Sequence, residues 1–375
     1  MKHTAPLYIQ FTTPPDRQLP KPDNAERNQL NVVYIIGNGF DINFGLPTRY
    51  SDFYARYVNT PVDNTRYRDE ILRFKKELST YPHNYLWADL ERGLGTYTAS
   101  FCSGKDNIKT YSVVINDVAK NLRDYLLETE GRIDEDKVSS FAPKFKTDIR
   151  YPWSYLKARD KQQVQKMLDQ HTAQDHLFQI ITFNYTDTFE RMVSYQERAV
   201  VTLGTREENR RTCRDILESI THVHGKLRDS IVFGVNDKSQ IANVAWQEDQ
   251  AVNNLIVKRT VNINGHGNRD EICDKQIKEA DVICSFGFSF GETDKLWSER
   301  IIRHLYKDKG AIMIMFCPGF VNGNAKESLF RHVNAHNILK EKGGADFNRA
   351  LEDIKDRIYI VKQHNFLRYG VLLKQ

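Results

Sequence analysis

The stretch Val32-Val33-Tyr34-Ile35-Ile36-Gly37-Asn38-Gly39-Phe40-Asp41 decides the fold class of this 375-residue chain. A short apolar run that ends at a glycine is typical of a strand covered on both faces, as in a parallel sheet. Glycines directly after such a strand let backbone N–H groups approach a phosphate, and the N-terminus of a following helix favours negative charge. The stretch therefore predicts an α/β fold with a ligand at the carboxyl end of its first strand.

Similar apolar runs recur downstream, and most of them are separated by stretches long enough for a crossover helix. They are Leu177–Thr182, Ile220–Val223, Val282–Phe286, Ile312–Phe316 and Ile358–Val361. This alternation predicts a Rossmann-like, doubly wound and mainly parallel sheet.

The segment between the first two strands has helical periodicity. An apolar stripe at steps of three and four residues consists of Ile108, Tyr111, Ile115, Val118, Leu122, Tyr125 and Leu126. We expect a large helical insertion at about residues 50–175, within a nucleotide-binding domain at 30–375 that follows an extended, proline-rich arm at 1–29. Trp87 and Glu91 would share a helix face, and we expect Trp87 in the core and Glu91 in solvent.

Composition argues against several classes of protein. The formal charge of +5 from 54 basic and 49 acidic residues is too small for a general polyanion binder, so nucleic acid is not an expected partner. Five scattered cysteines predict neither a disulfide framework nor a zinc knuckle, and they fit a reducing compartment. With neither a secretory signal nor a run of about 20 apolar residues, we expect a cytoplasmic protein without a membrane partner.

The loop from Gly37 to Asp41 is the first candidate for ligand binding. It lacks the full dinucleotide fingerprint of three glycines, because Gly45 comes six residues after Gly39. A plain tight turn is therefore an alternative. Asp41 would hydrogen-bond a ribose hydroxyl or cap a helix.

Polar residues also follow two later strands. Asn184 comes after Leu177–Thr182, and ligands of open parallel sheets bind at such carboxyl ends, although a local turn explains an asparagine there equally well. Strand alternation puts His222 and His224 on one face, where a histidine suits proton transfer near neutral pH. Structural histidines and a His-x-His metal site are the alternatives for this pair.

The fourth candidate follows the strand Val282–Phe286. The sequence Gly287-Phe288-Ser289-Phe290-Gly291 has the Gly-x-Ser-x-Gly spacing of a hydrolase nucleophile elbow. No later acid and histidine have a recognisable setting for that mechanism, so we favour a second nucleotide-contacting loop that includes Asp294.

Five blocks in this order resemble the AbiH family, which is associated with bacteriophage abortive infection. The blocks are Gly37-Asn38-Gly39-Phe40-Asp41 with Gly45-Leu46-Pro47, Trp87 with Glu91, Phe183-Asn184-Tyr185-Thr186, His224-Gly225, and Gly287-Phe288-Ser289 with Asp294. The resemblance runs from about Asn31 to Leu296 and implies a role in phage defence.

The same order is more distantly similar to sirtuin-like NAD-consuming domains, which have a glycine-rich loop followed by Thr-x-Asn, His-Gly and Gly-x-Ser blocks. This resemblance implies that Asn184 and His224 form a catalytic pair. Thr186 stands where sirtuins end the asparagine block with an acid, and Asp41 stands where they carry serine. The paired-cysteine zinc module of sirtuin deacylases is absent from the sequence, which argues against protein deacylation.

These considerations give one leading hypothesis and two alternatives. The leading hypothesis is an NAD glycohydrolase that needs no metal, with NAD as its substrate. The residues expected to contact NAD, besides the catalytic pair, are Gly37, Asn38, Gly39, Phe40, Asp41, Thr182, Tyr185, His222, Gly287, Ser289 and Asp294. The alternatives are a non-catalytic sensor of a related nucleotide and a metal-dependent nuclease or hydrolase that uses His222 and His224. A phage-derived trigger, a regulatory partner and homo-oligomerisation are the further interactions that we expect.

Overall fold

The computed structural model describes residues 29–80, 90–102, 104–171, 174–197, 199–229, 231–265, 268–317, 325–331, 333, 347–361 and 366–374. Residues 1–28 of the predicted arm lie outside these ranges, as does Trp87.

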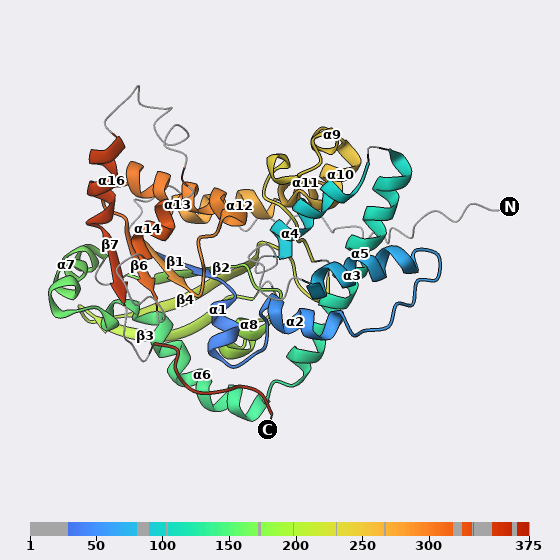
Figure 1. The fold of residues 1–375 in the computed structure, drawn as a ribbon. Coiled ribbons are helices and arrows are strands. Elements are labelled where there is room, and N and C mark those ends of the chain that lie inside the picture. Colours follow the sequence, from blue (N-terminus) through green and yellow to red (C-terminus); the bar gives the residue numbers. More distant parts are fainter. Residues whose placement is uncertain are drawn as a thin grey trace.

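The centre of the molecule is a seven-stranded sheet with the order β3-β4-β2-β1-β5-β6-β7 (Figure 1). The strands are β1 (Leu30–Ile36), β2 (His176–Thr182), β3 (Val201–Glu208), β4 (Arg211–His222), β5 (Val282–Phe286), β6 (Ile312–Phe316) and β7 (Ile358–Val361). All neighbouring strands are parallel except β3 and β4, which form an antiparallel pair. The predicted mainly parallel α/β sheet is confirmed, and the antiparallel edge strand β3 is an addition to it.

The register of the central strands aligns their carboxyl ends. Ile36 of β1 lies opposite both Thr182 of β2 and Phe286 of β5. Because β4 also runs parallel to β2, with His222 opposite Thr182, the loops that follow four strands begin at one edge of the sheet. Each of the four sequence-predicted candidates begins within two residues of this edge.

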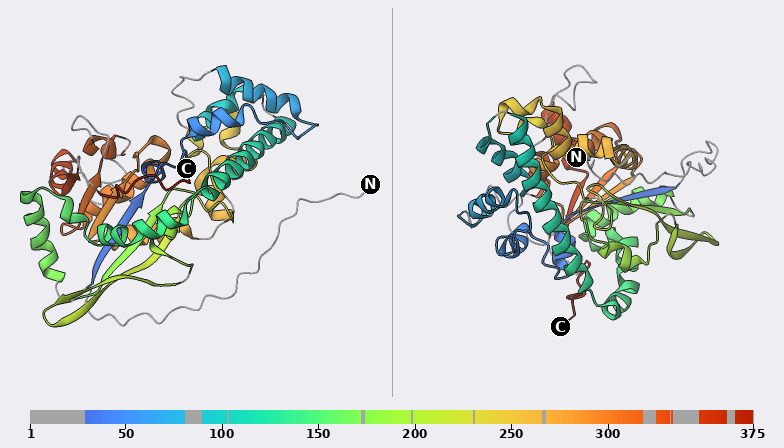
Figure 2. Two further views of the ribbon diagram at one scale, coloured as in Figure 1. Left: turned by 90° about the horizontal axis from the view of Figure 1, so that it is seen from below. Right: turned by 90° about the vertical axis from the view of Figure 1, so that its right-hand side faces the viewer.

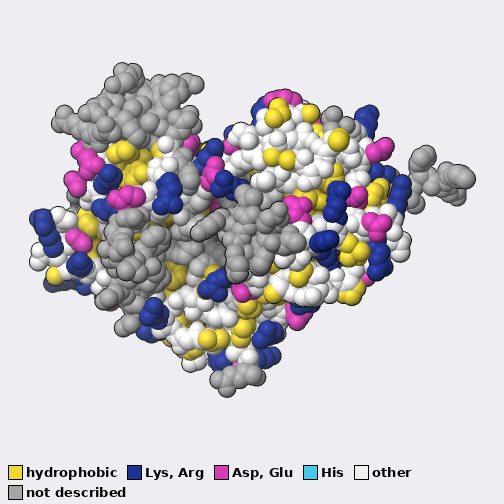
Figure 3. All heavy atoms as spheres, viewed as in Figure 1, with side chains coloured by type: hydrophobic (Ala, Val, Ile, Leu, Met, Phe, Trp, Pro, Cys, Tyr) yellow, Lys and Arg dark blue, Asp and Glu magenta, His cyan; other side chains and the backbone are white. Residues whose placement is uncertain are grey.

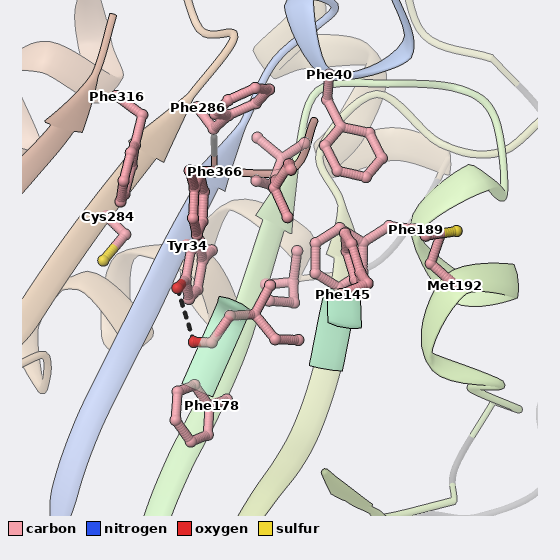
Figure 4. Packing of buried hydrophobic residues seen from close by; sticks show 14 of the residues in the cluster. Tyr34, Phe40, Phe145, Phe178, Phe189, Met192, Cys284, Phe286, Phe316 and Phe366 are labelled. Carbon is pink, nitrogen blue, oxygen red and sulfur yellow. Dashed lines mark hydrogen bonds between the residues drawn. The ribbon is translucent and has the colours of Figure 1, made fainter. Parts of the chain in front are cut away.

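One face of the sheet is covered by α1 (Gly39–Asn43), α6 (Glu135–Arg150) and α8 (Thr188–Val193). Aromatic side chains fill the space between these helices and the strands (Figure 4). Phe40 and Phe145 pack edge to face, with ring centroids 6.0 Å apart. Tyr34 places its hydroxyl in this core and donates a hydrogen bond to the Ile149 carbonyl at 2.7 Å, which satisfies the polar atom.

The opposite face carries a second helical layer. Its members are α12 (Arg269–Lys278), α13 (Lys295–Lys307), α14 (Ala325–Phe330) and α16 (Phe347–Lys355), which lie above the sheet in Figure 1. Val33 and Ile35 of β1 face this layer, whereas Val32 and Tyr34 face the first. Burial on both faces explains why β1 reads as a continuous apolar run.

A group of helices beside the sheet forms what we call the helical lobe (Figures 1 and 2). It contains α2 (Tyr50–Tyr57), α3 (Arg68–Thr80), α4 (Leu90–Tyr97) and α5 (Lys105–Gly131), together with α9 (Val244–Gln247), α10 (Gln250–Ile256) and α11 (Lys258–Gly265) from the connection between β4 and β5.

The predicted apolar stripe on α5 is confirmed, since Tyr111, Val118 and Leu122 are buried. Trp246 stacks on Phe101 at 5.5 Å and joins the two stretches of chain. Helices α6 and α7 (Ala158–Leu168) contribute to the core at the sheet instead.

Charges of both signs are interspersed on the face drawn in Figure 3, in keeping with the small net charge. Among the described residues, no helix has both the length and the apolar character that a bilayer crossing requires.

The β3–β4 hairpin is anchored by a buried carboxylate. Asp215 of β4 is fully buried, and its two oxygens accept hydrogen bonds from Arg150 Nε at 2.6 Å and Arg206 Nε at 2.7 Å. Both guanidinium groups are themselves largely buried. The carboxylate thus holds helix α6 and the edge strand β3 to the sheet.

We expect Asp215→Ala to lower the free energy of unfolding by about 3–5 kcal/mol, because two buried cations would lose their shared counter-ion. Urea denaturation measures this change. Asp124→Ala, which breaks an exposed ion pair with Lys120, is the matched control and should cost less than about 1 kcal/mol. Equal effects of the two substitutions would contradict the anchoring role of Asp215.

Candidate functional site

A cavity of about 560 Å³ lies at the carboxyl ends of the central strands, where the helical lobe meets the sheet. Its lining residues are Gly37, Asn38, Gly39, Ile42, Arg49, Tyr50, Ser51, Glu91, Phe183, Tyr185, His224, Gly287, Phe288, Ser289 and Asp294. The volume and the position are those of small-molecule sites in open α/β sheets. A larger hollow of about 900 Å³ between α7 and β7 contains none of these residues.

The glycines of the site bring two loops into contact. Gly37 N–H donates to the Phe286 carbonyl and Gly39 N–H to the Gly287 carbonyl, both at 3.0 Å. A Cβ atom on Gly39 would lie only 2.6 Å from Gly287 Cα, and Gly287 has a φ of 67°. Since these two N–H groups already have acceptors, a bound anion would contact other groups of the lining, among them the exposed Arg49 side chain.

Asn184 lines a smaller compartment of about 90 Å³, which shares four lining residues with the larger cavity. Only 5% of Asn184 is exposed, and its Oδ1 atom has no hydrogen-bond partner among the described residues. Asp41 lines the same compartment and accepts a hydrogen bond from the Thr186 hydroxyl at 2.7 Å. Burial raises the pKa of Asp41 to about 6, against hydrogen bonds from Thr186, Thr188 and Asn184 that lower it. The alternative that Asp41 caps a helix is wrong, because this carboxylate lies inside the molecule and makes no cap.

His222 supports Asn184 from outside both compartments. Its Nδ1 lies 2.8 Å from the Asn184 carbonyl and its Nε2 lies 2.6 Å from Glu190 Oε1. Lys226 Nζ lies 3.0 Å from the same Glu190 oxygen. Although burial raises the pKa of Glu190, His222 and Lys226 lower it to about 2. Both ring nitrogens of His222 are thus engaged, and in the described part of the chain no three His, Cys, Asp or Glu side chains converge as metal ligands.

His224 belongs to a separate buried cluster beside the larger cavity. Its Nε2 lies 3.6 Å from Asp294 Oδ1, which is too long for a good hydrogen bond but close enough for electrostatic attraction. Lys258 Nζ lies 3.0 Å from the same Asp294 oxygen and 2.9 Å from Glu91 Oε2. These four residues, which we call the ion cluster, come from the end of β4, the start of α13, and α11 and α4.

The ionisation of the ion cluster follows from its burial and its charges. Burial and then the neighbouring Lys258 lower the pKa of His224, so this ring is neutral at pH 7. Burial alone would raise the pKa of Asp294, but Lys258 and His224 hold it well below its ordinary value. Burial would lower the pKa of Lys258, which Asp294 and Glu91 raise instead. A neutral imidazole therefore stands beside an ionised carboxylate and an ammonium group.

Residues 33–316 match the family model described as Bacteriophage abortive infection AbiH. The chain belongs to the AbiH family. It is thus an anti-phage protein of the abortive-infection type, as its five sequence blocks predicted. No curated protein matches the sequence closely enough to add to this assignment. The matched residues extend from β1 to β6 and include every residue that lines the two compartments.

Most of the sequence-predicted site residues meet in the AbiH cavity. Eight of them line the larger compartment, namely Gly37, Asn38, Gly39, Tyr185, His224, Gly287, Ser289 and Asp294. Asn184 and Asp41 line the smaller one. Three others lie outside both linings. Phe40 is part of the aromatic core, Thr182 Oγ1 accepts the Asn184 backbone N–H at 3.2 Å, and His222 is engaged as described above.

Six residues that line the larger compartment were not predicted from the sequence, and the environment of Glu91 was misjudged. The six are Ile42, Arg49, Tyr50, Ser51, Phe183 and Phe288. Glu91, which we expected in solvent, is buried and ion-paired, because Lys258 from a remote segment lies against it. Lys258 itself was not singled out either. The only signal for Arg49 was its position shortly after the Gly45-Leu46-Pro47 turn.

We expect Gly287→Ala to lower the free energy of unfolding by at least about 2 kcal/mol, because a Cβ atom there would overlap the Phe40 backbone nitrogen at a positive φ. Chemical denaturation checks this value. Gly131→Ala is the matched control, since a Cβ atom on Gly131 meets nothing within 4 Å, and it should be neutral or stabilising by up to about 1 kcal/mol. If Gly287→Ala were as stable as Gly131→Ala, the two loops would not be in the contact described.

Proposed function

We propose that this AbiH protein hydrolyses NAD at the bond between nicotinamide and ribose. The observation that carries the proposal is the neutral, buried His224 at the wall of a cavity whose adjoining compartment contains Asn184. The order of the sequence blocks, similar to that of sirtuin-like NAD-consuming domains, adds independent support. Loss of NAD from an infected cell would stop its metabolism, which agrees with abortive infection.

In the proposed reaction the glycosidic C–N bond breaks, and nicotinamide leaves with the bonding electron pair. The ribose then carries positive charge at the anomeric carbon, and a water oxygen forms the new bond there. His224 takes the proton that this water loses, and ADP-ribose is the second product. The ionised Asp294 stabilises the imidazolium that forms, as a carboxylate beside a general base does in other hydrolases.

Asn184 suits the task of orienting the water and the ribose. Asn184 and Asp41 line one compartment, and the buried Oδ1 atom of each has no hydrogen-bond partner among the described residues. Buried acceptors without a donor cost about 1–3 kcal/mol each, which favours a bound hydroxyl or water that donates to them. Arg49, Asn38 and Ser51 line the larger compartment and would contact the pyrophosphate.

We expect the protein to release nicotinamide from NAD, and we expect His224→Ala and Asn184→Ala each to lower the rate at least about 100-fold. Nicotinamide release is measured with each purified protein, and NAD levels are measured in phage-infected cells that express each variant. His171→Ala and Asn121→Ala, which lie outside both compartments, are the controls and should retain activity. NAD that stays intact during infection would disprove the proposal, and tight NAD binding without release would favour the nucleotide sensor.

The rate of nicotinamide release should fall as the pH falls, because protonated His224 cannot accept a proton from the attacking water. Since burial and Lys258 lower its pKa, the midpoint of this acidic limb in kcat/KM should lie below about 6.5. Lys258→Met removes a neighbouring positive charge and should move the midpoint to higher pH. Lys238→Met, which removes an exposed lysine outside the cavity lining, should leave it unchanged. A pH profile unaffected by Lys258→Met would argue against His224 as the base.

A further inference from the structure

The wall of the cavity around His224 is negatively charged. Glu91 and Asp294 both line the cavity, whereas Lys258, which they share, is not among the lining residues. Both carboxylates pair with the one ammonium group of Lys258, and His224 adds no positive charge while it is neutral. Such a cluster attracts a cation more strongly than it would in water, because burial reduces the effective dielectric constant.

The same cavity has aromatic walls. Tyr50, Phe183, Tyr185 and Phe288 all line it. The ring centroid of Phe183 lies 4.4 Å from that of Phe288 and 5.3 Å from that of His224. Aromatic faces attract planar cations through the ring quadrupole, and they stack on flat heterocycles of any charge.

A third feature marks this wall as a ligand contact. His224 is only 5% exposed, and its Nδ1 atom has no hydrogen-bond partner within the described ranges. A buried nitrogen of this kind is costly unless a ligand or a reacting water meets it. Among the described residues that line the cavity, Arg49 is the only Lys or Arg, and because it is exposed its charge is screened by solvent.

We propose that the His224 end of the cavity selects a planar cationic heterocycle, so that oxidised NAD with its pyridinium ring binds in preference to NADH. This inference rests on the proposed function for the choice of NAD as ligand. The pyridinium ring would lie between the aromatic walls with Asp294 and Glu91 near its positive charge. The pyrophosphate would extend toward Arg49, so that opposite charges meet at both ends. NADH has an uncharged dihydropyridine ring and would lose the attraction to Asp294 and Glu91.

The test is a binding measurement that does not depend on turnover. Carbocyclic NAD has a methylene group in place of the ribose ring oxygen, which makes its nicotinamide bond resistant to cleavage while the pyridinium charge is kept. Calorimetry with the full-length protein should give a Kd for this analogue at least about tenfold lower than for its reduced form. The ratio of the two Kd values for the wild-type protein by itself tests the proposal, without reliance on any variant.

Asp294→Asn should then weaken binding of the oxidised analogue about tenfold and leave the Kd of the reduced form within about twofold. Glu292→Gln is the matched control, because Glu292 lies two residues before Asp294, pairs with Arg92 and does not line the cavity. Equal binding of the two forms by the wild-type protein, equal weakening of both by Asp294→Asn, or no binding of either would overturn the inference. Nicotinamide release without such a preference would leave the hydrolase proposal intact, and a preference without release would leave only the selectivity.

Discussion

The loops that follow β1 and β5 touch backbone to backbone, and the arrangement of the site depends on this contact. Gly39 donates to the Gly287 carbonyl at 3.0 Å, and side chains on Gly37, Gly39 or Gly287 would fill the space between the loops. Because β1 and β5 are neighbours in register, their ends are already adjacent, and the glycines let the loops turn outward together. Phe40 is thereby directed into the aromatic core, while Asn38 and Ser289 line the cavity.

A second constraint joins the helical lobe to this edge. Lys258 links Glu91 of α4 to Asp294 at the start of α13, and all three side chains are largely removed from solvent. Burying such charges costs several kcal/mol each, and apolar side chains of similar size often give equal or greater stability. Stability alone therefore does not explain an ion cluster at this position. The location of the cluster at the cavity wall favours a role in positioning His224 and in setting the charge around it.

The sequence contained enough information for the central sheet and for the edge at which the site lies. Continuous apolar runs identified β1, β2, β5, β6 and β7, because each of these strands contributes side chains to the hydrophobic clusters on both faces of the sheet. Strand β3 was missed because it lies at the edge of the sheet, where its charged residues obscure the alternation of apolar and polar side chains. Most of β4 was missed for a similar reason, since its first half pairs with β3 and alternates exposed with buried residues.

Site residues were predictable where polar residues directly follow a buried strand. They were unpredictable where contacts between segments remote in the sequence determine which side chains are buried. Lys258 and Glu91 are 167 residues apart, and no local pattern marks either one as buried. Strand alternation suggested a common face for His222 and His224, but β4 ends at His222 and the chain turns there, with Gly225 N–H donating to the His222 carbonyl. The two rings consequently enter different clusters, His222 with Glu190 and His224 with Asp294.

This divergence gives the two histidines different chemical capacities. The His222 ring has an acceptor atom at each nitrogen, so its hydrogen bonds hold Asn184 in place and leave neither nitrogen for a reacting proton. The Nδ1 atom of the His224 ring has no partner in the described part of the chain, and Lys258 opposes protonation of the ring while Asp294 stabilises the protonated form once a proton arrives. A base must be neutral before the reaction and must tolerate charge during it. Of the two histidines, only His224 stands in an environment that meets both conditions, which is why the proposed chemistry is assigned to the wall formed by His224 and Asp294.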